Sequence, residues 1–171
     1  MSWTYNGELI QSIEDVPEGA IGFIYNIVTY NVGGKGEAKE YIGSKVLFHD
    51  NKRLIKSKEY EKHPDKRTLR RYKSKRGKNK GEWMYYEDRK KESDWMTYTG
   101  SNDKLNSDIA EGVGITKYIL KFVFKESHLL YEETKAIFCT GALEEERFYN
   151  DHALSRFFKK NIIQKTVDNL V

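Results

Sequence analysis

Apolar and polar positions along the chain predict a strand hairpin in its first third. Residues 21–29 form a β-branched and aromatic run, which is typical of a buried strand. Gly33, Gly34 and Gly36 follow this run, and glycines are frequent in turns. Residues 39–45 form a second, shorter strand candidate. Two strands joined by a glycine-rich loop of about eight or nine residues predict an antiparallel hairpin.

The second half of the chain alternates between helical and strand patterns. Ser101 is a candidate N-cap for a helix over residues 102–111, and Gly112 would end that helix. Residues 115–124 form the strongest strand candidate of the chain. A further helix is expected over residues 127–139, with its first residue, a serine, as the candidate cap.

These elements predict an α+β fold, in which helices flank a small, three-stranded, antiparallel sheet. We expect a single domain over residues 1–171, with an insertion over residues 52–95 and a helical tail over residues 151–171. The strands expected in the sheet are residues 22–29, 39–45 and 115–124.

The net charge of +4 conceals an uneven distribution. Residues 52–91 carry 17 Lys or Arg and 6 Asp or Glu, a net charge of +11, whereas the other residues carry 13 and 20, a net charge of −7. Clustered cations in an otherwise acidic chain favour a nucleic-acid partner, and a solvated run of charges is the alternative. The residues expected to contact DNA are Arg67, Arg70, Arg71, Lys73, Lys75 and Arg76.

The basic insertion has few aliphatic residues with which to bury a core. Two local structures fit it: a helix over residues 65–75, beginning near Pro64, or a flexible loop that becomes ordered on a phosphate backbone. The aromatic residues after it are expected to serve in packing more often than in stacking on bases. They are Trp83, Tyr85, Tyr86, Trp95 and Tyr98.

Composition excludes several other classes of protein. No apolar run approaches the roughly 18 residues of a membrane-spanning helix. No secretory signal is visible at the N-terminus, and the single cysteine, Cys139, fits a reducing compartment. Cys and His residues show no zinc-site spacing. We therefore expect a cytoplasmic protein, neither secreted nor associated with a membrane.

Two short motifs on the predicted hairpin indicate an activity. The first strand contains Gly22 and, after one extra residue, Ile24 and Tyr25, whereas the second contains the tripeptide YIG from Tyr41 to Gly43. The two tyrosines are 16 residues apart, with the glycine-rich turn between them. This pair resembles the GIY-YIG nuclease superfamily, whose name comes from two such tripeptides on adjacent strands. The stretch YIGSK, the basic insertion and the turn from Tyr98 to Ser101 look like those of phage-encoded, homing-endonuclease-like members. This resemblance implies the cytoplasm of a bacterium or of a phage-infected host cell.

The resemblance implies roles for four residues. Tyr25 would orient or deprotonate the attacking water, and Tyr41 would hydrogen-bond to this water or to the scissile phosphate. Glu133, on the helix after the third strand, would hold Mg²⁺ or Mn²⁺. Asn150 follows 17 residues later and would hold the substrate or brace the site.

The family also places an arginine about ten residues after the tyrosine of its second motif, where this chain has asparagine. Lys45 and Arg53 are the candidate replacements, in that order, and Arg70 and Arg71 would serve if the insertion folds back. A lysine supplies a point charge in place of the planar fork of arginine, yet it still stabilises negative charge on phosphorus.

The expected function is that of a metal-dependent DNA endonuclease with a single site, which would dimerise or act twice to cut both strands. The alternatives are a non-catalytic nucleic-acid-binding module on the same fold and a phage accessory protein that docks an acidic partner. The tyrosines could be ordinary strand residues, Glu132 could replace Glu133, and Asn150 could cap the tail helix.

Overall fold

The computed structural model describes residues 2–153, and the chain divides into two compact units. Met1–Leu47 and Asp94–Val171 form one, which we call the core unit. Phe48–Ser93 form the other, which we call the insert unit and which overlaps the insertion expected over residues 52–95. Among the residues described, no helix is long and apolar enough to span a membrane.

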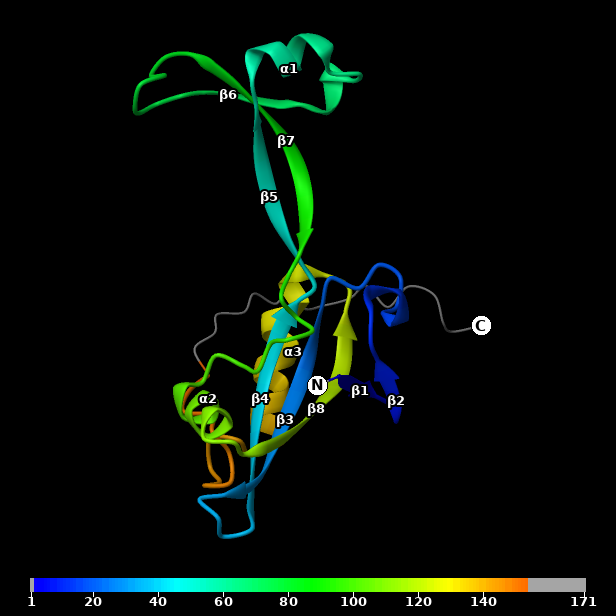
Figure 1. Cartoon of the computed structure of the whole chain (residues 1–171), viewed down its shortest axis with the longest axis vertical. Helices are drawn as coiled ribbons and strands as arrows, with labels where there is room; N and C mark the ends of the chain where they lie inside the picture. The colour runs from blue at the N-terminus through cyan, green and yellow to red at the C-terminus, as the bar shows by residue number, and fades with distance from the viewer. Residues whose placement is uncertain (1, 154–171) are drawn as a thin grey trace. The chain divides into compact units, whose positions relative to one another are not determined.

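The core unit contains a five-stranded sheet in the order β2-β1-β8-β3-β4 (Figure 1). The expectation of three strands is therefore wrong. The two additional strands are only three residues each, too short to show an alternating pattern. The first of them pairs in parallel with β8, and the other pairings are antiparallel. The strands are β1 (Trp3–Tyr5), β2 (Glu8–Ile10), β3 (Gly22–Val32), β4 (Glu37–Val46) and β8 (Gly114–Val123).

The predicted hairpin is β3 and β4, and β8 pairs with the other edge of β3. Tyr25 lies opposite Gly43, and Ile27 lies opposite Tyr41. Cross-strand partners point to the same face of a sheet, so the motif residues Tyr25, Tyr41 and Gly43 share one face.

Each face of the sheet packs on a separate apolar cluster. Helix α3 (Glu126–Cys139) packs against β3, β4 and β8, where Ile24, Ile42 and Ile137 form part of the core. On the opposite face, Trp3, Phe23 and Trp95 are fully buried, and the indole Nε1 of Trp3 donates to the carbonyl of Trp95 at 2.8 Å. The segment after the insert unit therefore covers the face that carries the motif tyrosines.

Both predicted helices form, but with other caps. Helix α2 (Asp103–Ala110) is capped by Asn102, whose side chain accepts from the backbone N–H of Leu105. The predicted cap, Ser101, is therefore wrong by one residue. Helix α3 begins at Glu126 after Lys125, without a side-chain cap, so Ser127 lies inside the helix.

Gly141 follows the end of α3 with φ +66°, and the backbone N–H of Ala142 donates to the carbonyl of Ile137. A left-handed residue at this position commonly ends a helix, and glycine adopts it without strain.

The insert unit is a small antiparallel sheet in the order β5-β7-β6, with one short helix. The helix expected over residues 65–75 is wrong, because Pro64 follows a helix and residues 70–73 form a strand. Alternating charged and aromatic residues conceal the apolar pattern by which strands are detected. The elements are β5 (Phe48–Ile55), α1 (Ser57–Lys62), the 3-10 turn η2 (Lys66–Thr68), β6 (Arg70–Lys73) and β7 (Trp83–Glu92).

The helical tail expected over residues 151–171 falls mostly outside the described residues. Residues 151–153 have no regular secondary structure, and residues 154–171 are not described.

Candidate active site

Tyr25 lies at the centre of the candidate site and is only 1% exposed. Its ring crosses Gly43 on the neighbouring strand, where a Cβ would lie 2.6 Å from the Tyr25 Cζ. This close approach explains why the second motif ends in glycine. Burial raises the pKa of the Tyr25 hydroxyl well above its ordinary value, and Tyr41, Tyr98 and Glu133 act in the same direction.

Tyr41 lies beside Tyr25, with ring centroids 6.1 Å apart. Its hydroxyl is 3.2 Å from the Ser101 Oγ, in the segment that covers this face. Burial raises the pKa of Tyr41, although the bond to Ser101 opposes the shift. Gly100, at φ +96°, provides room for the ring, because a Cβ there would lie 3.0 Å from the Tyr41 Cε1.

Glu133 points from α3 toward β4, where it accepts a hydrogen bond from the Ser44 Oγ at 3.0 Å. Burial raises the pKa of its carboxyl, and the bond from Ser44 opposes this. The charge of Glu133 also raises the pKa of both Tyr25 and Tyr41, so the three groups share one electrostatic environment. Glu132 points elsewhere and forms an ion pair with Lys121 of β8 at 2.8 Å.

Lys45 is the first cation after the second motif, and it belongs to the core unit. Its Nζ lies 2.5 Å from the Asp94 carboxylate and 3.7 Å from the ring centroid of Tyr98. The Tyr98 ring in turn makes an edge contact with Tyr25 at 6.1 Å. Tyr98 therefore links the charge of Lys45 to the buried tyrosine.

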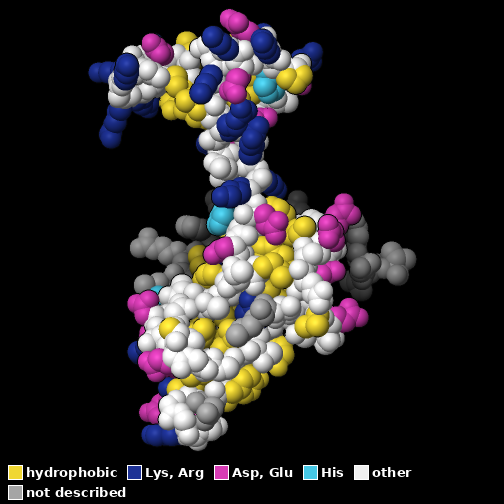
Figure 2. All heavy atoms as spheres, in the orientation of Figure 1, with side chains coloured by type: hydrophobic (Ala, Val, Ile, Leu, Met, Phe, Trp, Pro, Cys, Tyr) yellow, Lys and Arg dark blue, Asp and Glu magenta, His cyan; other side chains and the backbone are white. Residues whose placement is uncertain are grey.

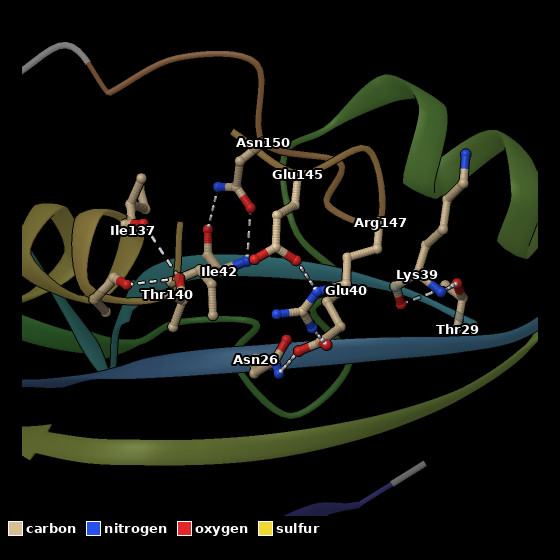
Figure 3. Close-up of polar contacts among 11 residues, drawn as sticks. Asn26, Thr29, Lys39, Glu40, Ile42, Ile137, Thr140, Glu145, Arg147 and Asn150 are labelled. Atoms are coloured by element: carbon tan, nitrogen blue, oxygen red, sulfur yellow. Dashed lines mark hydrogen bonds and ion pairs between the residues drawn. The ribbon is translucent and has the colours of Figure 1, made fainter. Parts of the chain in front are cut away.

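Asn150 pairs with the backbone of β4 (Figure 3). Its Oδ1 accepts from the N–H of Ile42 at 3.0 Å, and its Nδ2 donates to the carbonyl of the same residue at 2.8 Å. Both polar groups of the side chain are thus engaged by the strand. The arrangement braces the edge of the sheet, and the side chain does not act as a helix cap.

The segment before Asn150 continues this brace along β4. The backbone of Glu40 accepts from Tyr149 and donates to Arg147, and the Arg147 guanidinium also forms an ion pair with the Glu40 carboxylate (Figure 3). Asn26 Nδ2 donates to the other oxygen of Glu40 at 2.6 Å. The outer edge of β4 is therefore covered at residues 40–42, just before Gly43.

The other candidate cations belong to the insert unit. Arg53 forms ion pairs with Glu59 at 2.7 Å and Glu87 at 3.5 Å. Arg70 pairs with Asp88, and Arg71 lies over the ring of Trp83. All six residues expected to contact DNA are exposed, and Lys and Arg side chains gather over this unit (Figure 2). They are Arg67, Arg70, Arg71, Lys73, Lys75 and Arg76.

Three polar neighbours of the motif residues, Ser44, Tyr98 and Lys117, were not singled out by the sequence as site residues. Lys117 of β8 is 1% exposed, and its Nζ donates to the carbonyls of Met96 at 2.7 Å and Tyr98 at 3.2 Å. Burial lowers the pKa of this lysine to about 8. Lys117 could have been noticed because it lies within the strongest predicted strand, and strands buried on both faces rarely contain a lysine.

The donor groups are compatible with a divalent cation held by one carboxylate. Among residues 2–153, no three His, Cys, Asp or Glu side chains cluster at a possible metal site. Mg²⁺ is commonly bound through one or two carboxylates while it keeps several waters, and Glu133 offers such a half-buried carboxylate. Burial already disfavours the unpaired charge of Glu133, and a cation would offset that cost.

The two motifs lie on one hairpin, β3 and β4, and helix α3 presents the Glu133 carboxylate to β4. Together these features define a fold of the GIY-YIG nuclease class. The chain belongs to the family described as "Putative endonuclease segE, GIY-YIG domain", which it matches over residues 3–162. This is a phage-type GIY-YIG endonuclease family. No curated protein and no solved structure matches the chain.

Proposed function

We propose that the chain is a metal-dependent endonuclease that hydrolyses DNA phosphodiester bonds at one site in the core unit. The observation that carries this proposal is the position of Glu133, which α3 presents to Ser44 of the strand that carries the second motif. Its charge adds a smaller contribution than burial to the raised pKa of both motif tyrosines. Membership in the GIY-YIG endonuclease family supports nuclease activity. Glu133 would hold Mg²⁺ or Mn²⁺, and the chemistry supplied by a bound cation is charge neutralisation at the scissile phosphate.

The protein's own groups would orient the reactants. Tyr25 stays protonated at neutral pH because its pKa is raised, so we assign it the orienting role instead of that of a base. Tyr41 would donate a hydrogen bond to the water or the phosphate, after exchanging its contact with Ser101. Lys45 would stabilise the negative charge that develops on the phosphate, in place of the family's arginine.

Asn150 and Arg53 receive other roles. We assign Asn150 to bracing β4, since both of its polar groups already bond to Ile42. Arg53 belongs to the insert unit, where it pairs with two glutamates. Lys45 is also paired, with Asp94, but it belongs to the core unit and contacts the ring of Tyr98, and this favours Lys45 as the catalytic cation.

Supercoiled plasmid is the substrate with which to test the proposal. The wild-type protein should nick or linearise it with Mg²⁺ and not with EDTA. Glu133→Gln should abolish cleavage and leave DNA affinity nearly unchanged. Glu132→Gln is the matched control, because this adjacent carboxylate faces Lys121, and it should cut normally.

Other outcomes would contradict particular parts of the proposal. Cleavage by Glu133→Gln, with loss in Glu132→Gln, would assign the metal to the neighbouring carboxylate. A salt-sensitive gel shift without any cutting would favour a non-catalytic DNA-binding module, for which the replacement of the arginine by a lysine paired to Asp94 would be the explanation.

The ratio of nicked to linear product tests oligomeric state. One site cuts one strand, so concerted linearisation would require two copies, and we propose a homodimer for that step. Linearisation that rises with the square of protein concentration is expected for a dimer, whereas nicking followed slowly by linearisation is expected for a monomer that acts twice.

A further inference from the structure

The sheet of the insert unit has two different faces. Residues Ile55 and Tyr85 pair across β5 and β7, and the ring of Tyr60 from α1 stacks on Tyr85 with centroids 4.0 Å apart. The ion pair between Arg53 and Glu59 joins the same helix to the same face. Helix α1 therefore covers this face around Ile55 and Tyr85.

The opposite face is open within the unit. Leu54 pairs with Tyr86, and Met84 pairs with Tyr72, which places these four side chains together on it. Leu54 is 42% exposed and Tyr72 is 49% exposed. An exposed apolar face at the centre of a strongly charged unit is a common sign of a binding site.

Two tyrosines at the centre of the open face form a preorganised pair. The rings of Tyr72 and Tyr86 stack with centroids 4.9 Å apart and planes inclined by 19°. Their hydroxyl oxygens are 2.7 Å apart and share a hydrogen bond. The bond holds both rings in one orientation, so less side-chain entropy is lost when a planar ligand binds.

The charge around this face suits a polyanion. The insert unit has 17 Lys or Arg against 8 Asp or Glu, a net charge of +9. Among the described residues, no ion pair engages five cations that lie at the end of β6 and in the turn that follows it, and all five are exposed. They are Lys73, Lys75, Arg76, Lys78 and Lys80.

We infer that the open face of the insert unit, with Tyr72 and Tyr86 at its centre, binds unpaired DNA bases by stacking. Aromatic side chains beside a cationic surface are the usual means of binding single strands, because every base has a flat face once it leaves the duplex. A duplex conceals those faces, and reading its base edges needs free polar groups. The centre of this face presents rings and aliphatic chains, and the neighbouring Arg70 and Asp88 are paired with each other. The inference rests on the proposed DNA substrate and deepens it to DNA with an unpaired stretch.

Fluorescence anisotropy in EDTA tests the inference without cleavage. The probes are a fluorescein-labelled oligothymidylate, a duplex of equal length, and the same oligomer with abasic sites in place of its bases. Tyr72→Leu/Tyr86→Leu should weaken oligothymidylate binding by about tenfold or more, because stacking contributes about 1–3 kcal/mol per base. Its affinity for the duplex and for the abasic oligomer should change less than about twofold.

Two controls separate stacking from folding and from charge. Tyr72→Phe/Tyr86→Phe keeps both rings and should retain oligothymidylate affinity. Lys75→Ala/Lys78→Ala/Lys80→Ala should weaken binding to all three probes, since phosphate contacts do not depend on bases. Unchanged circular dichroism shows that the leucine variant is folded.

Equal affinity of the wild-type and leucine variants for oligothymidylate would overturn the inference, as would equal losses on all three probes. Wild-type protein that cuts plasmid but does not bind the oligomer would also overturn it, and the proposed function would stand. Wild-type protein that binds none of the probes and cuts no plasmid would instead contradict the proposed function.

Discussion

Tyr25 shows how one buried side chain constrains the chemistry proposed for the site. It is packed among Trp3, Phe23 and Tyr98, and its hydroxyl passes over Gly43 toward the outer strand of the sheet. A phenol held in this way has little freedom to move and keeps its proton at neutral pH. Its value to catalysis would lie in a fixed hydrogen-bond direction.

Gly43→Ala tests this packing. The new methyl would overlap the Tyr25 ring, so the tyrosine must move, which should cost about 1–3 kcal/mol of unfolding free energy. We also expect a loss of plasmid cleavage of at least about tenfold, because small misplacements of catalytic groups are costly. Urea unfolding and plasmid nicking measure the two effects.

Gly114→Ala is the matched control, since nothing lies within 4 Å of its added Cβ and its φ is not positive. Cleavage by Gly43→Ala at the rate of this control would show that the Tyr25 position is unimportant.

Lys117 should make the stability of the protein depend on pH. Its pKa is about 8 in the folded protein and 10.5 ordinarily, so the unfolded chain binds more protons between these values. The free energy of unfolding should therefore rise with pH across this window, by up to about 1 kcal/mol per pH unit from this group. Lys117→Met should lack this rise, and urea unfolding at several pH values measures the difference.

Lys121→Met is the control for Lys117→Met, because this residue is an exposed lysine on the same strand. Its unfolding free energy should follow that of the wild type with pH. Parallel curves for wild type and Lys117→Met would disprove the assignment.

The candidate site could be predicted from the sequence only where a motif marks it. Tyr25 and Tyr41 were found by the tripeptides, and strand register brings them together. Glu133 was distinguishable from Glu132 only in the structure, where one turns toward Ser44 and the other toward Lys121. Side chains that bond across long separations leave no local pattern in a sequence.

At the scale of elements, the strand β4 depends on a segment more than a hundred positions away in the chain. Arg147, Tyr149 and Asn150 bond to Glu40 and Ile42, so the segment forms a single parallel bridge and a side-chain clasp at the edge. An unpaired edge next to the site would expose backbone groups to other chains. The brace covers that edge up to Gly43.

Asn150→Ala should destabilise the protein by about 1–3 kcal/mol, because it removes two hydrogen bonds and leaves the backbone groups of Ile42 unpaired. Cleavage should fall in proportion to the unfolded fraction if bracing is the main role. Asp151→Ala is the control, and its exposed ion pair with Lys104 should contribute less than about 0.5 kcal/mol. A loss of cleavage at unchanged stability would instead favour direct contact of Asn150 with the substrate.

Elements with long runs of one pattern were predictable, and short or mixed ones were not. The strands β3 and β8 have eleven and ten residues, which is enough to show β-branched enrichment. The strand β4 has only Ile42 and Val46 of that class, and its place after the glycine-rich turn indicated it. The strand β6 has four residues, RRYK, all exposed, and forms because β7 pairs with it. Such a strand depends on its partner and not on its own composition.

At the scale of the whole molecule, charge is divided between the two units. The insert unit has a net charge of +9, and the rest of the chain has 13 Lys or Arg against 18 Asp or Glu, a net charge of −5. An acidic body would discourage DNA from binding elsewhere, and the basic unit would attract it. DNA affinity should therefore depend steeply on salt and be located in one unit.

Lys73→Ala/Lys75→Ala/Arg76→Ala tests this division of charge. The slope of log affinity against log salt is negative on duplex DNA. It should become less steep by about 0.9 for each phosphate that the variant no longer neutralises. Anisotropy titrations at several salt concentrations measure the slope, with Lys104→Ala of the core unit as control. An unchanged slope would show that these three cations form a solvated surface that does not contact DNA.

The two ends of the insert unit have a consequence for evolution. Phe48 pairs with Glu92 at one side of the junction, and Lys45 pairs with Asp94 at the other, so the chain departs and returns at nearly the same place. An insertion whose two ends lie close together can be shortened, exchanged or acquired by a single recombination event without disturbing the motif hairpin. If the insert unit contacts the target and the core unit cleaves it, as proposed above, replacing this segment would change the target and leave the chemistry of cleavage intact.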